Sequence, residues 1–355
     1  MAPTTNARVL FASVPKDFPI PGETTVYDTS QQIDLEHVPL NGGFLIKTLV
    51  LSIDPYMRGR MRAPETKSYS HPWQYTNASP CNSQFNSVCR LVGYGVGVVL
   101  RSEASDVAPG KYVYGDSIPH QQYAVLANVG GLTFLERDPK LSWTVYVGAA
   151  GMPGKTAYMG WKEFSQAKKG ETAFITTGAG PVGSMVIQLA KLDGLKVIVS
   201  AGSEEKVQFM KTIGADVAFN YKTTDTREVL AREGPIEIYW DNVGGDILDA
   251  ALEHANIFGR FLMCGMISGY NTGYEPIKNM HLTFGKSLTF NGIHVLRLND
   301  KYEAEFYSTV PTLLANGEMK YTEEVHQVLE SVGEAILRVQ KGTNTAKAVI
   351  VVAEE

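Results

Sequence analysis

The stretch TAFITTGAGPVGSMVIQLAKL, residues 172–192, decides the fold of this chain. Its first six residues are apolar or β-branched and predict a strand, whereas the amphipathic run 184–192 predicts a helix. The turn between them consists of Gly178, Ala179, Gly180, Pro181, Val182 and Gly183. The sequence therefore places the pattern G-x-G-x-x-G where a strand passes directly into a helix.

A strand, this glycine pattern and a helix in succession are what the pyrophosphate of a dinucleotide requires. We expect Gly178 to allow the tight turn, Gly180 to let the pyrophosphate approach the backbone, and Gly183 to let the helix pack on the strand. Free amides at the start of the helix then bind the pyrophosphate. The alternative is a glycine-rich turn that packs without binding a ligand.

The turn belongs to a regular alternation of strands and helix-length segments. Strands are predicted at residues 172–177, 196–201, 216–220, 236–241, 260–265 and 287–294. Crossovers of about 20 residues between them are typical of a doubly wound parallel sheet. We therefore predict an α/β Rossmann domain over residues 143–310.

The first third of the chain has a different pattern. Short β-type runs at residues 8–14, 43–53, 94–101, 111–115 and 122–127 are separated by Gly and Pro. Such spacing predicts an antiparallel, barrel-like domain. Residues 62–91 are predicted to form a long surface loop and are a candidate lid.

The end of the chain is predicted to complete that first domain. A helix over residues 300–315 precedes a strand at 321–327, a helix at 331–341 and an apolar strand at 348–353. An all-apolar strand is buried on both faces, so we expect it to return to the first domain. The predicted catalytic domain thus comprises residues 1–142 and 311–355.

Composition narrows the function classes. The 355 residues are 44% hydrophobic and 19% charged, with a net charge of −5 and no block of like charge, which argues against nucleic acid as a partner. No apolar run reaches the roughly 18 residues that cross a membrane. Cys81, Cys89 and Cys264 have no CxxC spacing, so we expect reduced thiols and a cytoplasmic protein.

The end of the second predicted strand indicates which dinucleotide is bound. An NAD enzyme usually carries an acid there, whereas this chain has Gly202 and Ser203. Lys206 and Tyr221 follow nearby and are candidates for binding a 2′-phosphate, which favours NADP(H). The two glutamates at 204–205 complicate this prediction, although acids are common in the first turn of a helix. The alternative is that Lys206 is a solvated helix lysine and Tyr221 a loop aromatic.

Seven ordered motifs resemble one known family. They are LSIDPYMR at 51–58, GMPGKTAY at 151–158, GPVGS at 180–184, AGSEEKV at 201–207, FNYK at 219–222, DNVGG at 241–245 and CGMISGYN at 264–271. Together they resemble the zinc-independent medium-chain dehydrogenase/reductases, and within them the prostaglandin reductase and alkenal double-bond reductase family. Two departures are Gly178, where many members have alanine, and a segment 62–91 that is longer than usual.

The resemblance implies a GroES-like, partly open β-barrel catalytic domain with the Rossmann domain inserted, and a homodimer joined through the last Rossmann strands. It also implies NADPH-dependent reduction of the carbon–carbon double bond of enals and enones. By position it assigns Lys206 and Tyr221 to the 2′-phosphate, Asn242 and Gly265 to the surroundings of the nicotinamide, Asn344 to a further cofactor contact, and Tyr56 and Tyr270 to the substrate carbonyl.

No zinc ligand set is visible in the sequence. His37, His71 and His120 are scattered, and Cys81 and Cys89 stand at irregular spacing from His71. We therefore predict no metal. A conjugated enone is already electrophilic at its β-carbon, so the protein has to position it and donate hydrogen bonds to the oxygen that gains charge.

Several alternatives stay open at this stage. Tyr270 is either a hydrogen-bond or proton donor or a packing ring, and water is the other source of the proton. Tyr56 belongs either to the site or to a rigid turn in which Arg58 pairs with Asp54. An NADPH quinone reductase and a non-catalytic NADPH-binding protein are the competing functions.

Overall fold

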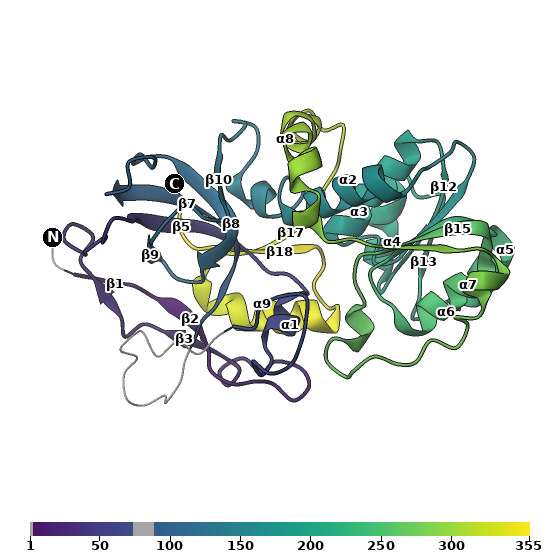
Figure 1. Cartoon of the computed structure of the whole chain (residues 1–355), viewed down its shortest axis with the longest axis horizontal. Coiled ribbons are helices and arrows are strands. Elements are labelled where there is room, and N and C mark those ends of the chain that lie inside the picture. Colours follow the sequence, from purple (N-terminus) through teal and green to yellow (C-terminus); the bar gives the residue numbers. More distant parts are fainter. Residues whose placement is uncertain (1–2, 74–88) are drawn as a thin grey trace. The chain divides into compact units, whose positions relative to one another are not determined.

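The computed structural model describes residues 3–73 and 89–355. The chain forms two compact units. Unit 1 comprises Met1–Val147 and Glu323–Glu355, and unit 2 comprises Gly148–Thr322 (Figure 1). Helix α8 (Asn299–Ala315), which the expected boundary at residue 310 divides, lies wholly in unit 2. The catalytic and nucleotide-binding roles of these two parts stay a prediction.

Unit 2 is built on the doubly wound parallel sheet that the sequence predicts. Its strands are β11 (Thr172–Ile175), β12 (Lys196–Ala201), β13 (Val217–Asn220), β14 (Ile236–Asp241), β15 (Ala255–Met263) and β16 (Thr289–Gly292). They are parallel and lie in the order β13-β12-β11-β14-β15-β16. Because the order reverses beside β11, the loops after β11 and β14 diverge at a topological switch point, where ligands bind in such folds.

Helices cover this sheet (Figure 1). They are α2 (Met152–Phe164), α3 (Pro181–Leu192), α4 (Glu204–Thr212), α5 (Thr226–Glu233), α6 (Gly245–His254), α7 (Leu282–Gly285) and α8. Within unit 2, the ring centroid of Tyr239 on β14 lies 5.3 Å from that of Phe174 on β11 and 5.4 Å from that of Phe261 on β15. These ring contacts therefore connect neighbouring strands. These buried aromatic side chains form part of the core of unit 2.

Helix α2 was not predicted from the sequence. Residues 153–161 are buried throughout, so the helix lacks the polar face that gives an amphipathic pattern. A Cβ on Gly160 would lie 2.9 Å from Ile293 Cδ1 and 3.0 Å from the Trp240 ring. Glycine therefore allows the helix to approach the sheet more closely than any other residue would.

Unit 1 contains a mixed sheet and smaller antiparallel ones. The large sheet runs β10 (Leu132–Leu135), β8 (Tyr112–Pro119), β7 (Val92–Ser102), β5 (Phe44–Ser52), β18 (Lys347–Val351) and β17 (Glu323–His326), with β9 (Tyr123–Leu126) also paired to β5. A second sheet has the order β3 (Thr25–Asp28), β2 (Arg8–Phe11) and β6 (Cys89–Arg90), and β1 (Thr4–Thr5) pairs with β4 (Gln32–Ile33). Mixed pairing of this kind agrees with the predicted partly open barrel.

The last strand returns to unit 1 as expected. Strand β18 pairs antiparallel with β5, with Val349 opposite Ser52, and its residues 347–350 are buried. Helix α9 (Val332–Lys341) precedes it and contributes Val332, Ala335, Ile336 and Val339 to the core of this unit. The C-terminal segment therefore completes the unit that the N-terminal residues begin.

Two expectations concern the candidate lid and the location of the protein. Residues 74–88 of the candidate lid, with Cys81, lie outside the described residues. Within the described ranges 3–73 and 89–355, no helix is both long and apolar enough to cross a membrane. The cytoplasmic location stays a prediction.

Candidate functional site

The glycine-rich turn after β11 begins at Thr177. This residue lies in the left-handed region, with a φ of +50°. Gly178 is needed for space instead, because a Cβ there would lie 2.6 Å from Met210 Sδ and 3.1 Å from Val199 Cβ. Thr177 therefore supplies the left-handed conformation of the turn, and Gly178 supplies the space.

The other two glycines have the expected surroundings. A Cβ on Gly183 would lie 2.5 Å from the carbonyl oxygen of Thr177, so only glycine lets α3 begin this close to β11. A Cβ on Gly180 would meet only that same oxygen within 4 Å, at 3.2 Å, which leaves the backbone open to a ligand. In the first turn of α3 the amides of Val182 and Gly183 have no intrahelical acceptor. Pro181 has no amide hydrogen to donate. The turn therefore fits a pyrophosphate.

The ends of β12 and β13 meet at Gly202. A Cβ on this residue would lie 3.1 Å from Tyr221 Oη and 3.2 Å from Lys222 Cε, so a phenol and a lysine side chain lie against the open backbone. Ser203 caps α4, since its hydroxyl accepts a hydrogen bond from the amide of Lys206 at 3.4 Å. Lys222 was missed in the sequence, although it stands directly after Tyr221 in the FNYK motif.

Glu204, one of the two complicating acids, is bound within the fold. Its Oε1 accepts a hydrogen bond from Asn220 Nδ2 at 3.1 Å, which joins the start of α4 to the end of β13. The same Asn220 accepts from the amide of Lys222 through Oδ1 at 3.1 Å. The glutamate thus has a structural role in shaping the loop that carries Tyr221.

Asp241 fixes the loop after β14. Its buried Oδ1 accepts hydrogen bonds from Tyr239 Oη at 2.9 Å and from the amides of Val243 and Gly244 at 2.8 Å each. Burial raises the pKa of this carboxyl to about 6, although these hydrogen bonds act in the opposite direction. Its main-chain oxygen accepts from the amide of Gly265 at 3.0 Å, so the loops after β14 and β15 are held together.

Asn242 is held in one orientation beside this carboxyl group. Its Nδ2 donates to the carbonyl of Thr176 at 2.7 Å, and its amide donates to Thr176 Oγ1 at 2.8 Å. Trp240 Nε1 donates to Asn242 Oδ1 at 3.3 Å. A side chain fixed from both sides is suited to line a ligand without moving.

Tyr270 lies over Gly265. A Cβ on that glycine would be 3.0 Å from Tyr270 Oη and 3.7 Å from the carbonyl oxygen of Asn242. The amide of Met266 donates to the phenol oxygen at 3.4 Å. The structure therefore brings Asn242, Gly265 and Tyr270 together at the carboxyl edge of the parallel sheet, where the glycine-rich turn and Gly202 also lie.

Tyr56 belongs to unit 1 and follows a turn held by a buried ion pair. Lys347 Nζ on β18 lies 2.8 Å from Asp54 Oδ1 and donates to the carbonyl of Ile53 at 2.6 Å. Arg58 instead donates to main-chain carbonyls, including that of Asp17 at 3.0 Å. The alternative in which Arg58 pairs with Asp54 was wrong, because Lys347 is the cation that binds this carboxylate.

The Tyr56 hydroxyl is buried and has no hydrogen-bond partner among the described residues. Burial, with smaller contributions from Asp54 and Tyr94, raises the pKa of this phenol well above its ordinary value. A Cβ on Gly93 would lie 3.7 Å from Tyr56 Oη and 3.1 Å from His120 Nε2. Tyr56 thus remains protonated and is available as a hydrogen-bond donor.

His120 is a second buried polar group in this region, and it was considered in the sequence only as a scattered histidine. Neither ring nitrogen has a hydrogen-bond partner within residues 3–73 and 89–355, and the same holds for Arg60 Nε. Burial and then the charge of Arg60 lower the pKa of His120 to about 3. The neutral ring offers one donor and one acceptor beside Tyr56.

Two further expectations concern Asn344 and a metal. Asn344 lies in unit 1 between α9 and β18, and its Nδ2 donates to the carbonyl of Ala346 at 2.8 Å. Its cofactor contact stays a prediction. In the part of the chain that the structure describes, no three His, Cys, Asp or Glu side chains are grouped as metal ligands.

Comparison with known proteins agrees with both parts of this architecture. The family described as zinc-binding dehydrogenase matches residues 181–313, and the family described as N-terminal domain of oxidoreductase matches residues 22–133. The chain is 36% identical to (+)-pulegone reductase of Mentha piperita over 89% of each chain. This protein is a medium-chain dehydrogenase/reductase.

Other medium-chain dehydrogenase/reductases support the same placement. A 2-alkenal reductase (NADP(+)-dependent) of Nicotiana tabacum is 37% identical over 88% of each chain. Among solved structures, CurA from Vibrio vulnificus in complex with NADPH has a TM-score of 0.83 and 32% identity, over 98% of this chain and 100% of that one. The similarity extends over both units of this medium-chain dehydrogenase/reductase.

The buried pair beside Tyr56 makes a testable prediction about stability. Lys347→Met leaves the Asp54 carboxylate buried without its partner, so we expect a loss of about 3–5 kcal/mol in the free energy of unfolding. The double variant with Asp54→Asn removes both charges and should recover part of that loss. Urea denaturation followed by circular dichroism measures both, with the exposed Lys341→Met as control. An equal loss of unfolding free energy in the single and double variants would contradict the stabilising role of this ion pair.

Proposed function

We propose that this protein reduces the carbon–carbon double bond of α,β-unsaturated aldehydes and ketones. The observation that carries the proposal is the buried Tyr56 hydroxyl, which keeps its proton and has no partner among the described residues. Leaving a buried donor unsatisfied is costly unless a ligand completes it. The names of the pulegone and 2-alkenal reductases support the same substrate class.

The cofactor is NADP(H), as in the similar enzymes. When bound, it supplies the hydride that the conjugated substrate accepts at its β-carbon. The turn from Gly178 to Gly183 would hold the pyrophosphate, and Asn242 and Gly265 would line the nicotinamide. The residues proposed for the 2′-phosphate are Gly202, Ser203, Lys206, Tyr221 and, in addition, Lys222, with Asn344 as a further contact.

The chain's own part in the reaction is to stabilise charge on the substrate oxygen. We assign Tyr56 and Tyr270 as the hydroxyl groups that donate to the carbonyl oxygen as it becomes an enolate oxygen. A phenol held in a buried environment suits this role because it stays protonated and needs little reorganisation. No metal is part of this proposal, because conjugation already makes the β-carbon electrophilic and the sequence lacks a zinc ligand set.

The position of the transferred hydrogen tests the function. With NADPH deuterated on the transferring face and a simple enone, we expect deuterium at the β-carbon of a saturated ketone, identified by NMR and mass spectrometry. Deuterium on the carbinol carbon of an allylic alcohol would overturn the proposal. A preference for quinones with hydroquinone as product would identify a quinone reductase, and NADPH binding without turnover a non-catalytic protein.

The two phenols are tested in the same assay. Tyr56→Phe and Tyr270→Phe each remove one hydroxyl, and loss of one such donor is expected to lower turnover by roughly 10²–10³ while NADPH affinity changes little. Tyr274→Phe is the control, because that ring is 64% exposed. Wild-type turnover in both single variants, across several enones, would show that neither phenol stabilises the enolate.

Cofactor preference tests the cations near Gly202. Because a charge-assisted contact is worth roughly 1.5–3 kcal/mol, Lys206→Ala should weaken NADPH binding by about 10- to 100-fold and leave NADH binding nearly unchanged. We expect the same direction for Lys222→Ala. Lys211→Ala, in the last turn of the same helix as Lys206, is the control. Fluorescence titration gives both affinities, and equal losses for the two cofactors would contradict this role.

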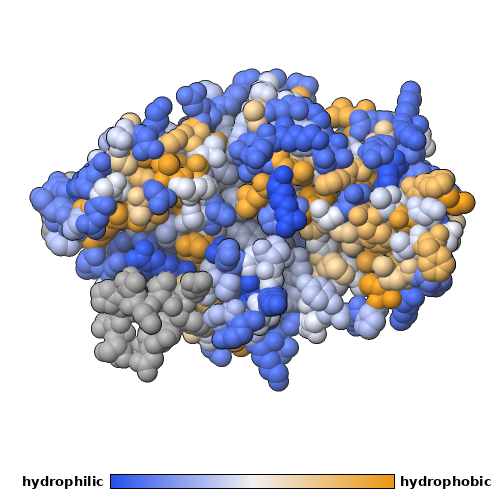
Figure 2. Space-filling model, viewed as in Figure 1, coloured by the Kyte–Doolittle hydropathy of each residue, from blue (hydrophilic) through white to orange (hydrophobic). Residues whose placement is uncertain are grey.

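We also propose that two copies of the chain form a homodimer through β16. This strand is at the edge of its sheet, and Ile257, Phe258 and Phe284 near it are 62%, 72% and 82% exposed. Figure 2 shows hydrophobic residues gathered over the part of unit 2 where Figure 1 labels α6 and α7. An open edge beside exposed apolar side chains is suited to pairing with a second copy.

Sedimentation velocity tests this assembly. The wild-type chain of 38.8 kDa should sediment as a species of twice that mass, and Phe284→Glu should shift it toward the monomer because the charge is costly to bury. Phe134→Glu, on a ring that is 40% exposed in unit 1, is the control. A wild-type monomer at micromolar concentration would reject the dimer.

A further inference from the structure

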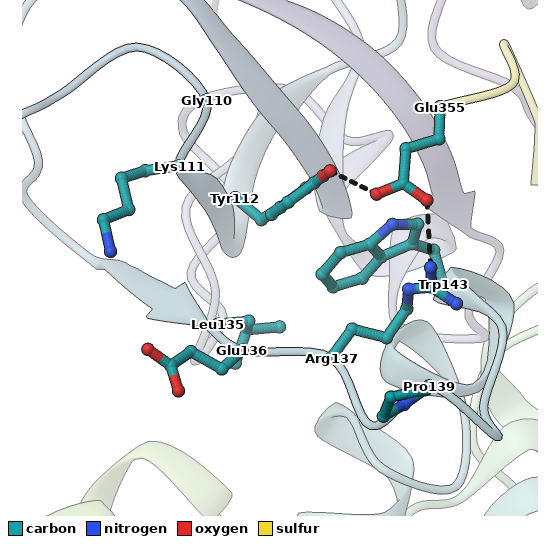
Figure 3. Close-up of a pocket in the computed structure, with 9 residues that line it drawn as sticks. All are labelled: Gly110, Lys111, Tyr112, Leu135, Glu136, Arg137, Pro139, Trp143 and Glu355. Carbon is teal, nitrogen blue, oxygen red and sulfur yellow. Dashed lines mark hydrogen bonds and ion pairs between the residues drawn. The ribbon is translucent and has the colours of Figure 1, made fainter.

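Unit 1 contains a pocket of about 340 Å³ that none of the proposed reaction steps uses. Its walls come from Tyr112 on β8, from Leu135 at the end of β10 with Arg137 just after it, and from the 3₁₀ helix Trp143–Val147. Figure 3 shows the side chain of Glu355 at one end of the pocket, next to Tyr112 and Trp143. The pocket thus combines aromatic rings, one arginine and a carboxylate from a distant part of the chain.

Aromatic side chains form one face of this pocket. The rings of Tyr112 and Trp143 lie 4.4 Å apart between centroids, and the Arg137 guanidinium lies 5.5 Å from the Trp143 ring centroid. Trp143 is only 7% exposed, and Arg137 Nη1 donates to the carbonyl of Leu141 at 2.9 Å. These contacts hold the arginine in place through Nη1 and through the face of its guanidinium group, and its second terminal nitrogen, Nη2, binds Glu355.

The Glu355 carboxylate occupies the polar end of the pocket. It accepts a hydrogen bond from the Tyr112 hydroxyl and another from Arg137 Nη2 at 3.0 Å (Figure 3). The Tyr112 hydrogen bond, with smaller contributions from Arg137 and Trp143, lowers the pKa of this carboxyl below its ordinary value. Two donors on different segments therefore converge on one ionised carboxylate.

The contacts that hold the Glu355 side chain in the pocket are weak enough for it to leave. The Glu355 side chain is 45% exposed and that of Arg137 is 30% exposed, and ion pairs with such access to water contribute little to stability. The neighbouring main chain is held separately, because Lys47 Nζ donates to the carbonyl of Glu354 at 2.7 Å. The Glu355 side chain can therefore leave the pocket without detaching the residues before it.

We propose that this pocket binds a small carboxylate with a flat, apolar body, and that Glu355 occupies it in the absence of that ligand. The arginine and the tyrosine hydroxyl would bind the ligand's carboxylate as they now bind that of Glu355. The Tyr112 and Trp143 rings with Leu135 would contact its apolar body.

The charges at the rim do not change this assignment. Figure 3 shows Lys111 and Glu136 on the side of the pocket away from Glu355. Both residues are exposed and of opposite sign, so their effects on an anionic ligand offset each other and are screened by salt. The selectivity for an anion therefore depends on Arg137 and Tyr112.

Benzoate is the probe that tests the site, with isothermal titration calorimetry on the full chain. The tethered Glu355 carboxylate competes for the same donors, but an exposed ion pair is worth no more than about 1 kcal/mol, so we expect Glu355→Ala to bind benzoate about 2- to 5-fold more tightly than the wild type. Glu355→Gln, which keeps the shape and loses the charge, should bind in between. In ¹H–¹⁵N spectra the indole resonance of Trp143 should shift on titration.

Matched controls separate recognition from nonspecific binding. Benzyl alcohol lacks the carboxylate and acetate lacks the ring, so both should bind Glu355→Ala at least about 10-fold more weakly than benzoate does. Arg137→Gln in the Glu355→Ala background should abolish benzoate binding, whereas Lys111→Ala should change it by less than about threefold. Enone reduction by Glu355→Ala should equal that of the wild type.

Three results would overturn the proposal. The first is an equal benzoate affinity in the wild type and in both Glu355 variants. The second is undiminished binding after Arg137→Gln, and the third is an absence of saturable binding to either Glu355 variant at about 10 mM benzoate. These results do not depend on the reaction catalysed, since binding is measured without cofactor or enone.

Discussion

The buried ion pair between Lys347 and Asp54 joins β18, near the end of the chain, to the turn that follows β5. Lys347 is 3% and Asp54 2% exposed, and the ammonium group also donates to the carbonyl of Ile53. Ser52 Oγ donates to the second carboxylate oxygen at 2.5 Å, so both oxygens are satisfied. A buried charge is stable only with such a complete set of partners. The turn that carries Tyr56 therefore depends on β18, which lies almost 300 residues later in the sequence.

A second contact from the same segment strengthens this connection. Gln340 Nε2 on α9 donates to the carbonyl of Pro55 at 3.0 Å, directly beside Tyr56. The apolar face of α9 packs into the core that β5 and β7 also form. Polar contacts thus fix the turn while apolar packing supplies most of the stabilisation. The Tyr56 phenol is therefore presented from a rigid base.

In unit 2 the fold brings together side chains from distant parts of the sequence. Parallel strands place all their carboxyl ends at one edge, so the loops after β11, β12, β13, β14 and β15 become neighbours. Small residues then let the backbone approach closely, as at Gly183 and Gly202. Asp241 joins two of these loops through side-chain and main-chain hydrogen bonds. The site is a consequence of the topology, refined by a few buried polar groups.

The sequence by itself determined the parallel sheet, the glycine-rich turn and the return of the last strand, because strand and helix periodicities and the spacing of glycines are local properties. It did not reveal α2, whose residues are buried all round and lack an amphipathic pattern. Nor did it indicate that Thr177, directly before the glycine-rich turn, adopts a positive φ.

Tertiary structure alone decided which charges meet. Asp54 pairs with Lys347 and not with Arg58, Lys222 joins Tyr221 at Gly202, and Glu355 reaches Arg137. The partners in the two ion pairs are distant in sequence, and whether Lys222 reaches Gly202 depends on the direction of its side chain. No local sequence pattern encodes either property. Their meeting depends on how strands pair and loops fold back, which is a property of the whole chain.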